Sequence, residues 1–176
     1  MSDAEKQTIL VEYARARSVF HGLLDTATKA DLRRPSRGTR WTNEQLLFHM
    51  LFGYIIVRTL LVLVRLFGRL PVGVSRAFAW LLNSAVVPFD WVNYVGSRIG
   101  ARVINQRRMG ALFDHTTAAL ERRLNRETEA DLLRGMHYPV RWDRFFNDFM
   151  TLADVYRYPT QHFDFHGEQL TFGADT

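Results

Sequence analysis

The amino-acid sequence predicts an all-α fold, a helical bundle, from three observations. Apolar residues recur at the three- and four-residue spacing of helices over several long stretches, and helix-capping residues precede two of them. The alternation typical of strands, hairpin dipeptides and fixed-period repeats are absent. The chain has 176 residues, of which 47% are hydrophobic, so we expect one domain with a substantial core.

The first predicted helix covers about residues 3–27. Its apolar stripe includes Tyr13, Phe20 and Leu24 at helical spacing. A polar connector over residues 28–39 follows and contains Pro35 and Gly38, both of which interrupt helices.

The second predicted helix begins at a capping box, in which the Thr42 hydroxyl and the Gln45 side chain bond to backbone N–H groups. It runs to about residue 67 and is apolar over residues 46–64, close to the roughly 20 residues of a membrane span. Arg58 in mid-span would cost about 2.5–3.5 kcal/mol on an insertion scale. We therefore expect a helix buried in the bundle or at an oligomer interface, with peripheral membrane contact as the lesser alternative.

The sequence after residue 67 predicts further helices. Residues 71–104 are helix-compatible but broken by glycines and Pro88, so we expect two or three short pieces there. Another long helix is predicted over residues 105–125, and an irregular connector over residues 135–147. The last helix begins near Thr151, with Asp154 as its capping partner, and ends near Leu170.

Composition excludes several classes of protein. The chain has no cysteine, so it holds neither disulfides nor a cysteine nucleophile of its own. The net charge is +5, but the arginines are dispersed or interleaved with glutamates, which is typical of a solvated surface and indicates no nucleic-acid partner. The polar first residues do not form a signal peptide, so a cytoplasmic location is expected, and membrane contact is not.

Three of the six histidines form a candidate metal site. His162 and His166 are spaced i, i+4, which places both imidazoles on one face of a helix, where they can share a divalent ion. His49 lies within an apolar helix face, where an imidazole needs a hydrogen bond or a metal. The other three have no matching partner, and we interpret them as ordinary histidines: His21, His115 and His137.

Two motifs resemble those of the DinB/YfiT-like family. The segment of residues 41–50, WTNEQLLFHM, resembles the Trp-[ST]-x₆-His beginning of the family's second helix. The segment of residues 158–170, YPTQHFDFHGEQL, resembles its final helix, in which His-x₃-His precedes Gln-[LI]. The resemblance extends over the whole chain, residues 1–176. It implies a single DinB-like domain folded as an antiparallel four-helix bundle, with a helical insertion at about residues 70–104 between the second and third core helices.

The resemblance also implies a function. Three histidines of the family bind a divalent metal, typically zinc or nickel, and they correspond here to His49, His162 and His166. Characterised relatives are thiol-dependent S-transferases and an isomerase, so the resemblance implies a bacterial detoxification enzyme that uses a low-molecular-weight thiol of the mycothiol or bacillithiol type. Gln45, Tyr158 and Gln169 lie within a turn of these histidines and are candidates to orient them or the substrate.

Two alternatives to thiol transfer stay open. The same metal could activate water in a hydrolase, or the protein could be a non-catalytic stress-response or binding protein with a vestigial or structural metal. In each case the expected partner is a small molecule. The apolar segment of residues 66–104 favours a hydrophobic pocket wall or a homodimer.

Overall fold

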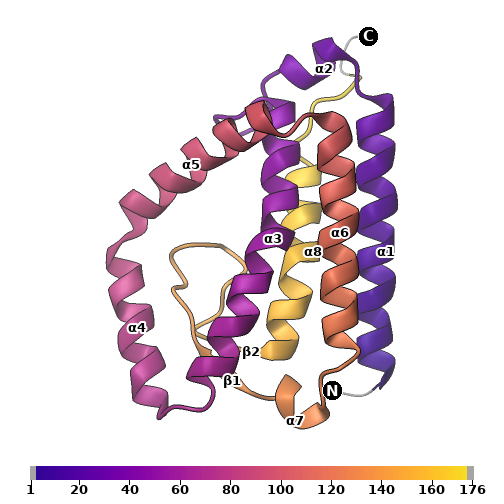
Figure 1. Ribbon diagram of the computed structural model, residues 1–176. Helices are drawn as coiled ribbons and strands as arrows, with labels where there is room; N and C mark the ends of the chain where they lie inside the picture. The colour runs from indigo at the N-terminus through magenta and orange to yellow at the C-terminus, as the bar shows by residue number, and fades with distance from the viewer. Residues whose placement is uncertain (1–2, 174–176) are drawn as a thin grey trace.

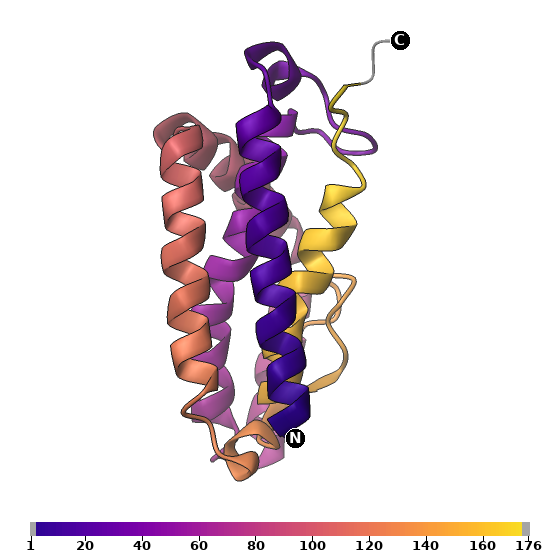
Figure 2. The same ribbon diagram turned by 90° about the vertical axis from the view of Figure 1, so that its right-hand side faces the viewer.

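The computed structural model describes residues 3–173 and is mostly helical, as predicted. Four long helices lie side by side: α1 (Asp3–Thr26), α3 (Asn43–Phe67), α6 (Gln106–Leu124) and α8 (Leu152–Gly167) (Figures 1 and 2). Residues 1–2 and 174–176, which the single-domain expectation includes, lie outside the described part.

Helix α3 runs through the core and packs against α8 and α6. It begins at the predicted capping box, in which the Thr42 side chain accepts the Gln45 N–H. Within residues 3–173 one helix, α3, is long and apolar enough to cross a membrane, and 56% of its most apolar window is buried. Burial against the other helices accounts for the apolar composition of α3.

An aromatic cluster joins the four long helices at their centre. Phe20 of α1 stacks on Phe113 of α6, with 4.6 Å between ring centroids, and Tyr54 of α3 lies 4.7 Å from the same Phe113 ring. Phe163 of α8 packs edge-on against Phe20. These rings are almost entirely inaccessible to solvent, so the cluster ties the two histidine-bearing helices to the rest of the core.

Helices α4 (Val72–Ser84) and α5 (Val86–Val103) form an arm that bows away from the long helices (Figure 1). The two are bent by 71° relative to each other. Pro88 is tolerated as the third residue of α5, because N–H groups in a first turn have no partner within the helix. Gly100 lies against the Phe48 ring, where a Cβ would overlap it, so α5 approaches α3 closely.

The remaining elements are short, and the sequence did not reveal them. Helix α2 (Lys29–Arg33) lies in the predicted polar connector, and α7 (Glu129–Leu132) follows α6. The predicted all-α fold class holds as a mostly helical fold with one short strand pair, in which β1 (Gly135–His137) pairs antiparallel with β2 (Phe149–Thr151). Strands of three residues are too short to show alternation. The pair returns the chain to the start of α8.

Candidate metal centre

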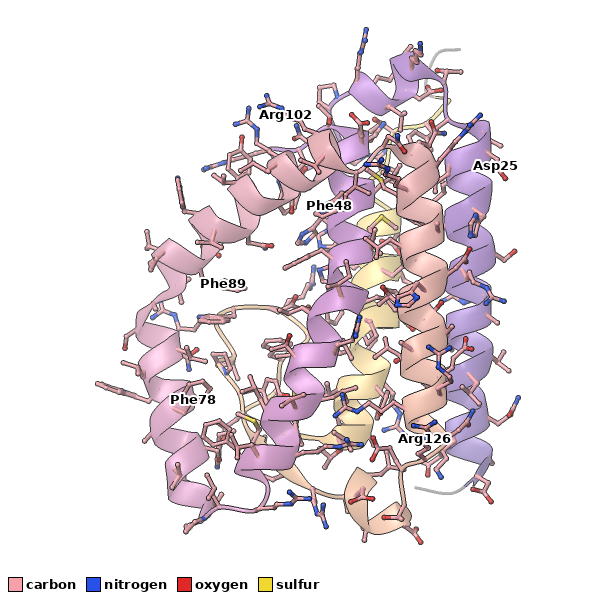
Figure 3. All side chains as sticks on the ribbon, viewed as in Figure 1. Asp25, Phe48, Phe78, Phe89, Arg102 and Arg126 are labelled. Carbon is pink, nitrogen blue, oxygen red and sulfur yellow. The ribbon has the colours of Figure 1, made fainter. Side chains whose placement is uncertain are left out.

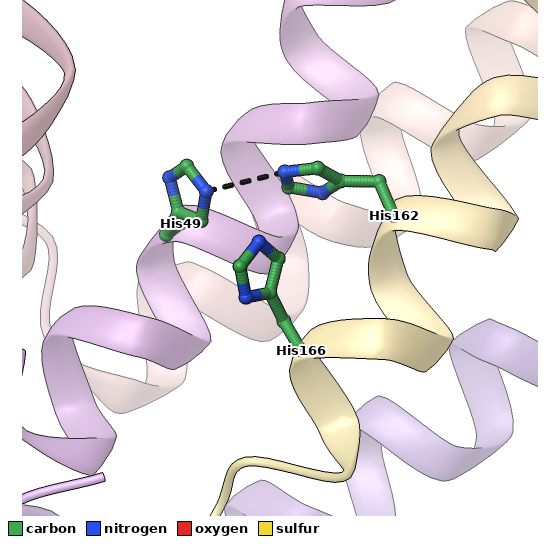
Figure 4. Close-up of side chains that lie close together, drawn as sticks. All are labelled: His49, His162 and His166. Atoms are coloured by element: carbon green, nitrogen blue, oxygen red, sulfur yellow. Dashed lines mark hydrogen bonds between the residues drawn. The ribbon is translucent and has the colours of Figure 1, made fainter. Parts of the chain in front are cut away.

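Three histidines from two helices converge in the interior (Figure 4). His49 lies on α3, and His162 and His166 lie one turn apart on α8. One ring nitrogen of each lies within 4.8 Å of the others, and the Nε2 atoms of His49 and His162 are 3.1 Å apart. His49 and His162 are only 5% and 4% exposed. The packing of α3 against α8 therefore brings together residues that lie far apart in the sequence.

Hydrogen bonds orient two of the three rings. The Nδ1 of His166 lies 2.7 Å from Oε1 of Gln169, and because this amide oxygen accepts, Nδ1 carries the proton and Nε2 is free. The Nδ1 of His49 bonds to Oγ of Ser97 at 3.2 Å. A donating Nδ1 leaves the Nε2 lone pair directed into the cluster, which is the arrangement of metal-binding histidines.

Burial keeps all three imidazoles neutral. Loss of solvent and, to a lesser degree, the repulsion that a protonated His166 would exert lower the pKa of His49 to about 3. Burial, with smaller contributions from His49 and His166, lowers the pKa of His162 well below its ordinary value, and burial also lowers that of His166. Neutral imidazole is the form that binds metal.

The donor set fits a divalent transition metal. Two nitrogens bound to one tetrahedral ion at zinc–nitrogen distances of about 2.0–2.1 Å lie about 3.3 Å apart, close to the 3.1 Å between His49 and His162. Three imidazoles suit zinc, nickel, copper or iron. His162 also packs tightly against α3 at Gly53, so this ring has little freedom to turn away.

A groove leads from the surface to His166. Its volume is about 670 Å³, and one wall is residues 38–41 before α3. The other wall comes from α5 and consists of Val87, Asp90, Trp91, Asn93 and Tyr94. Phe165, His166 and Gln169 line the groove from α8. The Trp41 ring stacks on His49 with 4.4 Å between centroids. The cluster is therefore closed toward the core and open on the side of the groove.

The three predicted accessory residues lie in different surroundings. Gln169 contacts His166 through the hydrogen bond described above. Gln45 instead accepts the Thr42 N–H in the capping box of α3. Tyr158 is buried, and its hydroxyl donates to Oδ2 of Asp143 at 2.8 Å. Its hydroxyl is therefore bound to the protein rather than presented in the groove.

Sequence reasoning missed three residues that shape the site. Asp143 lies in the loop between β1 and β2, and its Oδ2 is 3.9 Å from Nε2 of His162. Ser97 comes from α5 and holds His49. Gly53 lets the His162 ring approach the α3 backbone. Only Gly53 carried a signal, as a glycine inside a long helix; Ser97 and Asp143 belong to elements whose position depends on tertiary packing.

The other histidines lie outside the cluster. His21 pairs with Asp114 at 2.9 Å, His137 pairs with Asp148 at 3.2 Å, and His115 is exposed. These contacts are consistent with the interpretation of all three as ordinary histidines.

Replacing Gly53 by alanine is expected to disrupt the cluster. The new Cβ would lie 2.6 Å from Nδ1 of His162, which forces that ring to move. We expect Gly53→Ala to weaken zinc binding by about tenfold or more, measured by competition with a chromogenic chelator. Gly22→Ala is the matched control, because a Cβ there meets nothing within 4 Å; equal zinc affinities of the two variants would contradict this role of Gly53.

The free energy of unfolding of the metal-free protein is expected to decrease as the pH falls from 7 to 5. The unfolded chain protonates its histidines near pH 6.5, whereas folded His49 stays neutral down to about pH 3. Between these values the unfolded state binds more protons, so His49 alone should remove about 2 kcal/mol of unfolding free energy from pH 7 to pH 5. Urea unfolding with chelator present measures this. His115→Gln should keep the dependence and His49→Gln should reduce it; a wild-type protein equally stable at both pH values would contradict the expectation.

The three histidines lie within a match to a known protein family. No curated protein and no solved structure gives a significant match to the chain. A family model described as the DinB superfamily matches residues 12–170, which includes all three histidines. The chain therefore belongs to the DinB superfamily.

Proposed function

We propose that this protein is a divalent-metal-dependent enzyme that transfers a low-molecular-weight thiol, of the mycothiol or bacillithiol type, onto an electrophilic small molecule. His49, His162 and His166 are the proposed ligands of zinc or nickel. The observation that carries the proposal is their convergence as neutral imidazoles beside an open groove. The proposal includes the family's antiparallel four-helix bundle, with α4 and α5 as the insertion.

The metal, when bound, would lower the pKa of a coordinated thiol and so favour the thiolate. The chain's own residues position the reaction. Gln169 holds the His166 ring in the tautomer that leaves Nε2 free, and Ser97 holds the His49 ring through its Nδ1. Trp41 covers one face of His49. The groove, at about 670 Å³, has the size of pockets that take small molecules, and it provides space for a thiol and its acceptor.

The charge of the site favours an anionic co-substrate. Three neutral imidazoles leave the charge of a dication uncompensated in a buried place, where isolated charge is costly. Asp143 is the nearby acidic group, and Tyr158 and the Phe145 N–H hold its carboxylate in place. Burial raises the pKa of Asp143, while these two hydrogen bonds oppose that rise. One carboxylate and one thiolate would balance the charge of a dication.

The composition supports an external source of sulfur. The chain has no cysteine, so the protein itself supplies no thiol nucleophile. A low-molecular-weight thiol that enters through the groove would meet the cluster at His166.

Metal content tests the ligand assignment. We expect the purified wild-type protein to carry close to one zinc or nickel ion per chain by elemental analysis, because three neutral imidazoles converge. His162→Ala/His166→Ala should lose it, and His21→Ala/His115→Ala, which changes two histidines outside the cluster, should retain it. Equal metal in both double variants would show that the cluster is not the site.

Thiol transfer tests the reaction. We expect the metal-loaded protein to consume mycothiol or bacillithiol in the presence of a chromogenic electrophile such as 1-chloro-2,4-dinitrobenzene. His49→Ala should fall to the uncatalysed rate while retaining wild-type helicity by circular dichroism, because it lacks one metal ligand. Turnover of ester substrates without any thiol would instead favour the hydrolase alternative. A fully metal-loaded protein without either activity would favour the non-catalytic one.

A further inference from the structure

The outer face of the α4–α5 arm is apolar and unpartnered in the described part of the chain. Trp80 is 71% exposed, Val92 60% and Val103 64%. Large apolar side chains are seldom exposed together on a protein surface unless they form an interaction site. The other large apolar residues exposed on the arm are Val72, Val74, Leu81 and Ile99. Val87 and Trp91 are also exposed, but they line the groove at His166.

The inner face of the arm already has its partners. Phe78 stacks on Phe67 of α3 at 4.8 Å between centroids, and Phe89 stacks on Trp142 of the β1–β2 loop at 4.0 Å. Figure 3 labels Phe78 and Phe89 on the concave side of the arm. The arm is thus held to the protein by one apolar face while the opposite apolar face points outward.

The arm lies in a strongly basic part of the chain. Residues 45–113 contain eight arginines and one acidic residue, Asp90. Arg65 pairs with Glu127 of the main body, and Arg98 lies over the Tyr94 ring. The others in this stretch are Arg58, Arg69, Arg76, Arg102, Arg107 and Arg108. Arg76 of α4 and Arg102 of α5 are exposed on the arm itself. An apolar surface whose helices also carry arginines complements an anionic surface.

The same charge disfavours a second copy of the chain as the occupant. A symmetric contact brings each patch against itself, so it would place arginines near arginines. The shape of the outer face also disfavours a second copy. The 71° bend makes the outer face convex (Figure 1), and two convex faces share little area.

We propose that the outer face of α4 and α5 docks on the surface of a lipid bilayer that contains anionic lipids. The convex apex, with Trp80 and Leu81 before the bend and Val92 after it, enters the boundary between headgroups and acyl chains. Amphipathic helices bind there through buried apolar area and through attraction of their cations, and tryptophan favours that depth. Helix α3 stays in the core, so the protein lies on the bilayer. The docking does not rest on the metal chemistry.

Vesicle flotation tests the docking. We expect the wild-type protein to float with vesicles of phosphatidylcholine and phosphatidylglycerol, and to bind at least about tenfold more weakly to phosphatidylcholine alone or at high salt. Leu81→Asp/Val92→Asp places charge on the apex and should reduce binding by about tenfold or more. Val11→Asp/Leu133→Asp is the matched control, because these residues are similarly exposed outside the arm and carry the same added charge. It should bind within about twofold of wild type.

Tryptophan quenching locates the inserted residues in the wild-type surface. Lipids brominated near the headgroup end of the acyl chain should quench the emission of Trp80, and Trp80→Phe should lose most of that quenching. Absence of flotation, or equal flotation of the two Asp double variants, would overturn the proposal. So would a wild-type dimer in sedimentation velocity that Leu81→Asp/Val92→Asp dissociates without any vesicle binding, since a second copy would then cover the face.

Discussion

The packing of α3 against α8 is the constraint on which the site depends. It places His49 with its Nε2 3.1 Å from that of His162, and Gly53 makes this approach possible because it has no side chain in the space that the His162 ring occupies. Burial at the same contact removes the imidazoles from water and keeps them neutral. One helix contact therefore determines the position of the donor atoms, their protonation state and their capacity to hold a cation.

The arm of α4 and α5 supports this site from beyond the four long helices. Its inner side contributes Ser97, which bonds to His49, and it forms one wall of the groove at His166. Its outer side exposes Trp80 and Val92. Two faces of the same helices thus have different physical roles. The inner face contributes a hydrogen bond to the histidine cluster within the apolar core. The outer face presents apolar side chains that the described part of the chain leaves uncovered, and the bilayer surface is their proposed partner.

Much of the helical framework was predictable because local chemistry determines it. The Thr42 and Thr151 capping boxes begin α3 and α8 where the sequence indicated, since capping involves residues only three positions apart. The short β1–β2 pair was not predictable, because three-residue strands carry no period and depend on partners about fourteen positions away. Asp143 was missed for the same reason, since its loop reaches the cluster only through the folded chain.

The sequence by itself determined that the chain is mostly helical, that it carries the motifs of the DinB superfamily, and that two histidines share one face of its last long helix. Spacing along a helix is sufficient for such statements, because 3.6 residues per turn convert sequence positions into directions. The sequence also predicted, through the family resemblance, that His49 joins that pair and that Gln169 is a candidate to orient a ligand. Only the tertiary structure decided the distances between the three rings, the contact of Ser97 with His49, and the groove that reaches them. Those features depend on how separate helices pack, which local sequence does not determine.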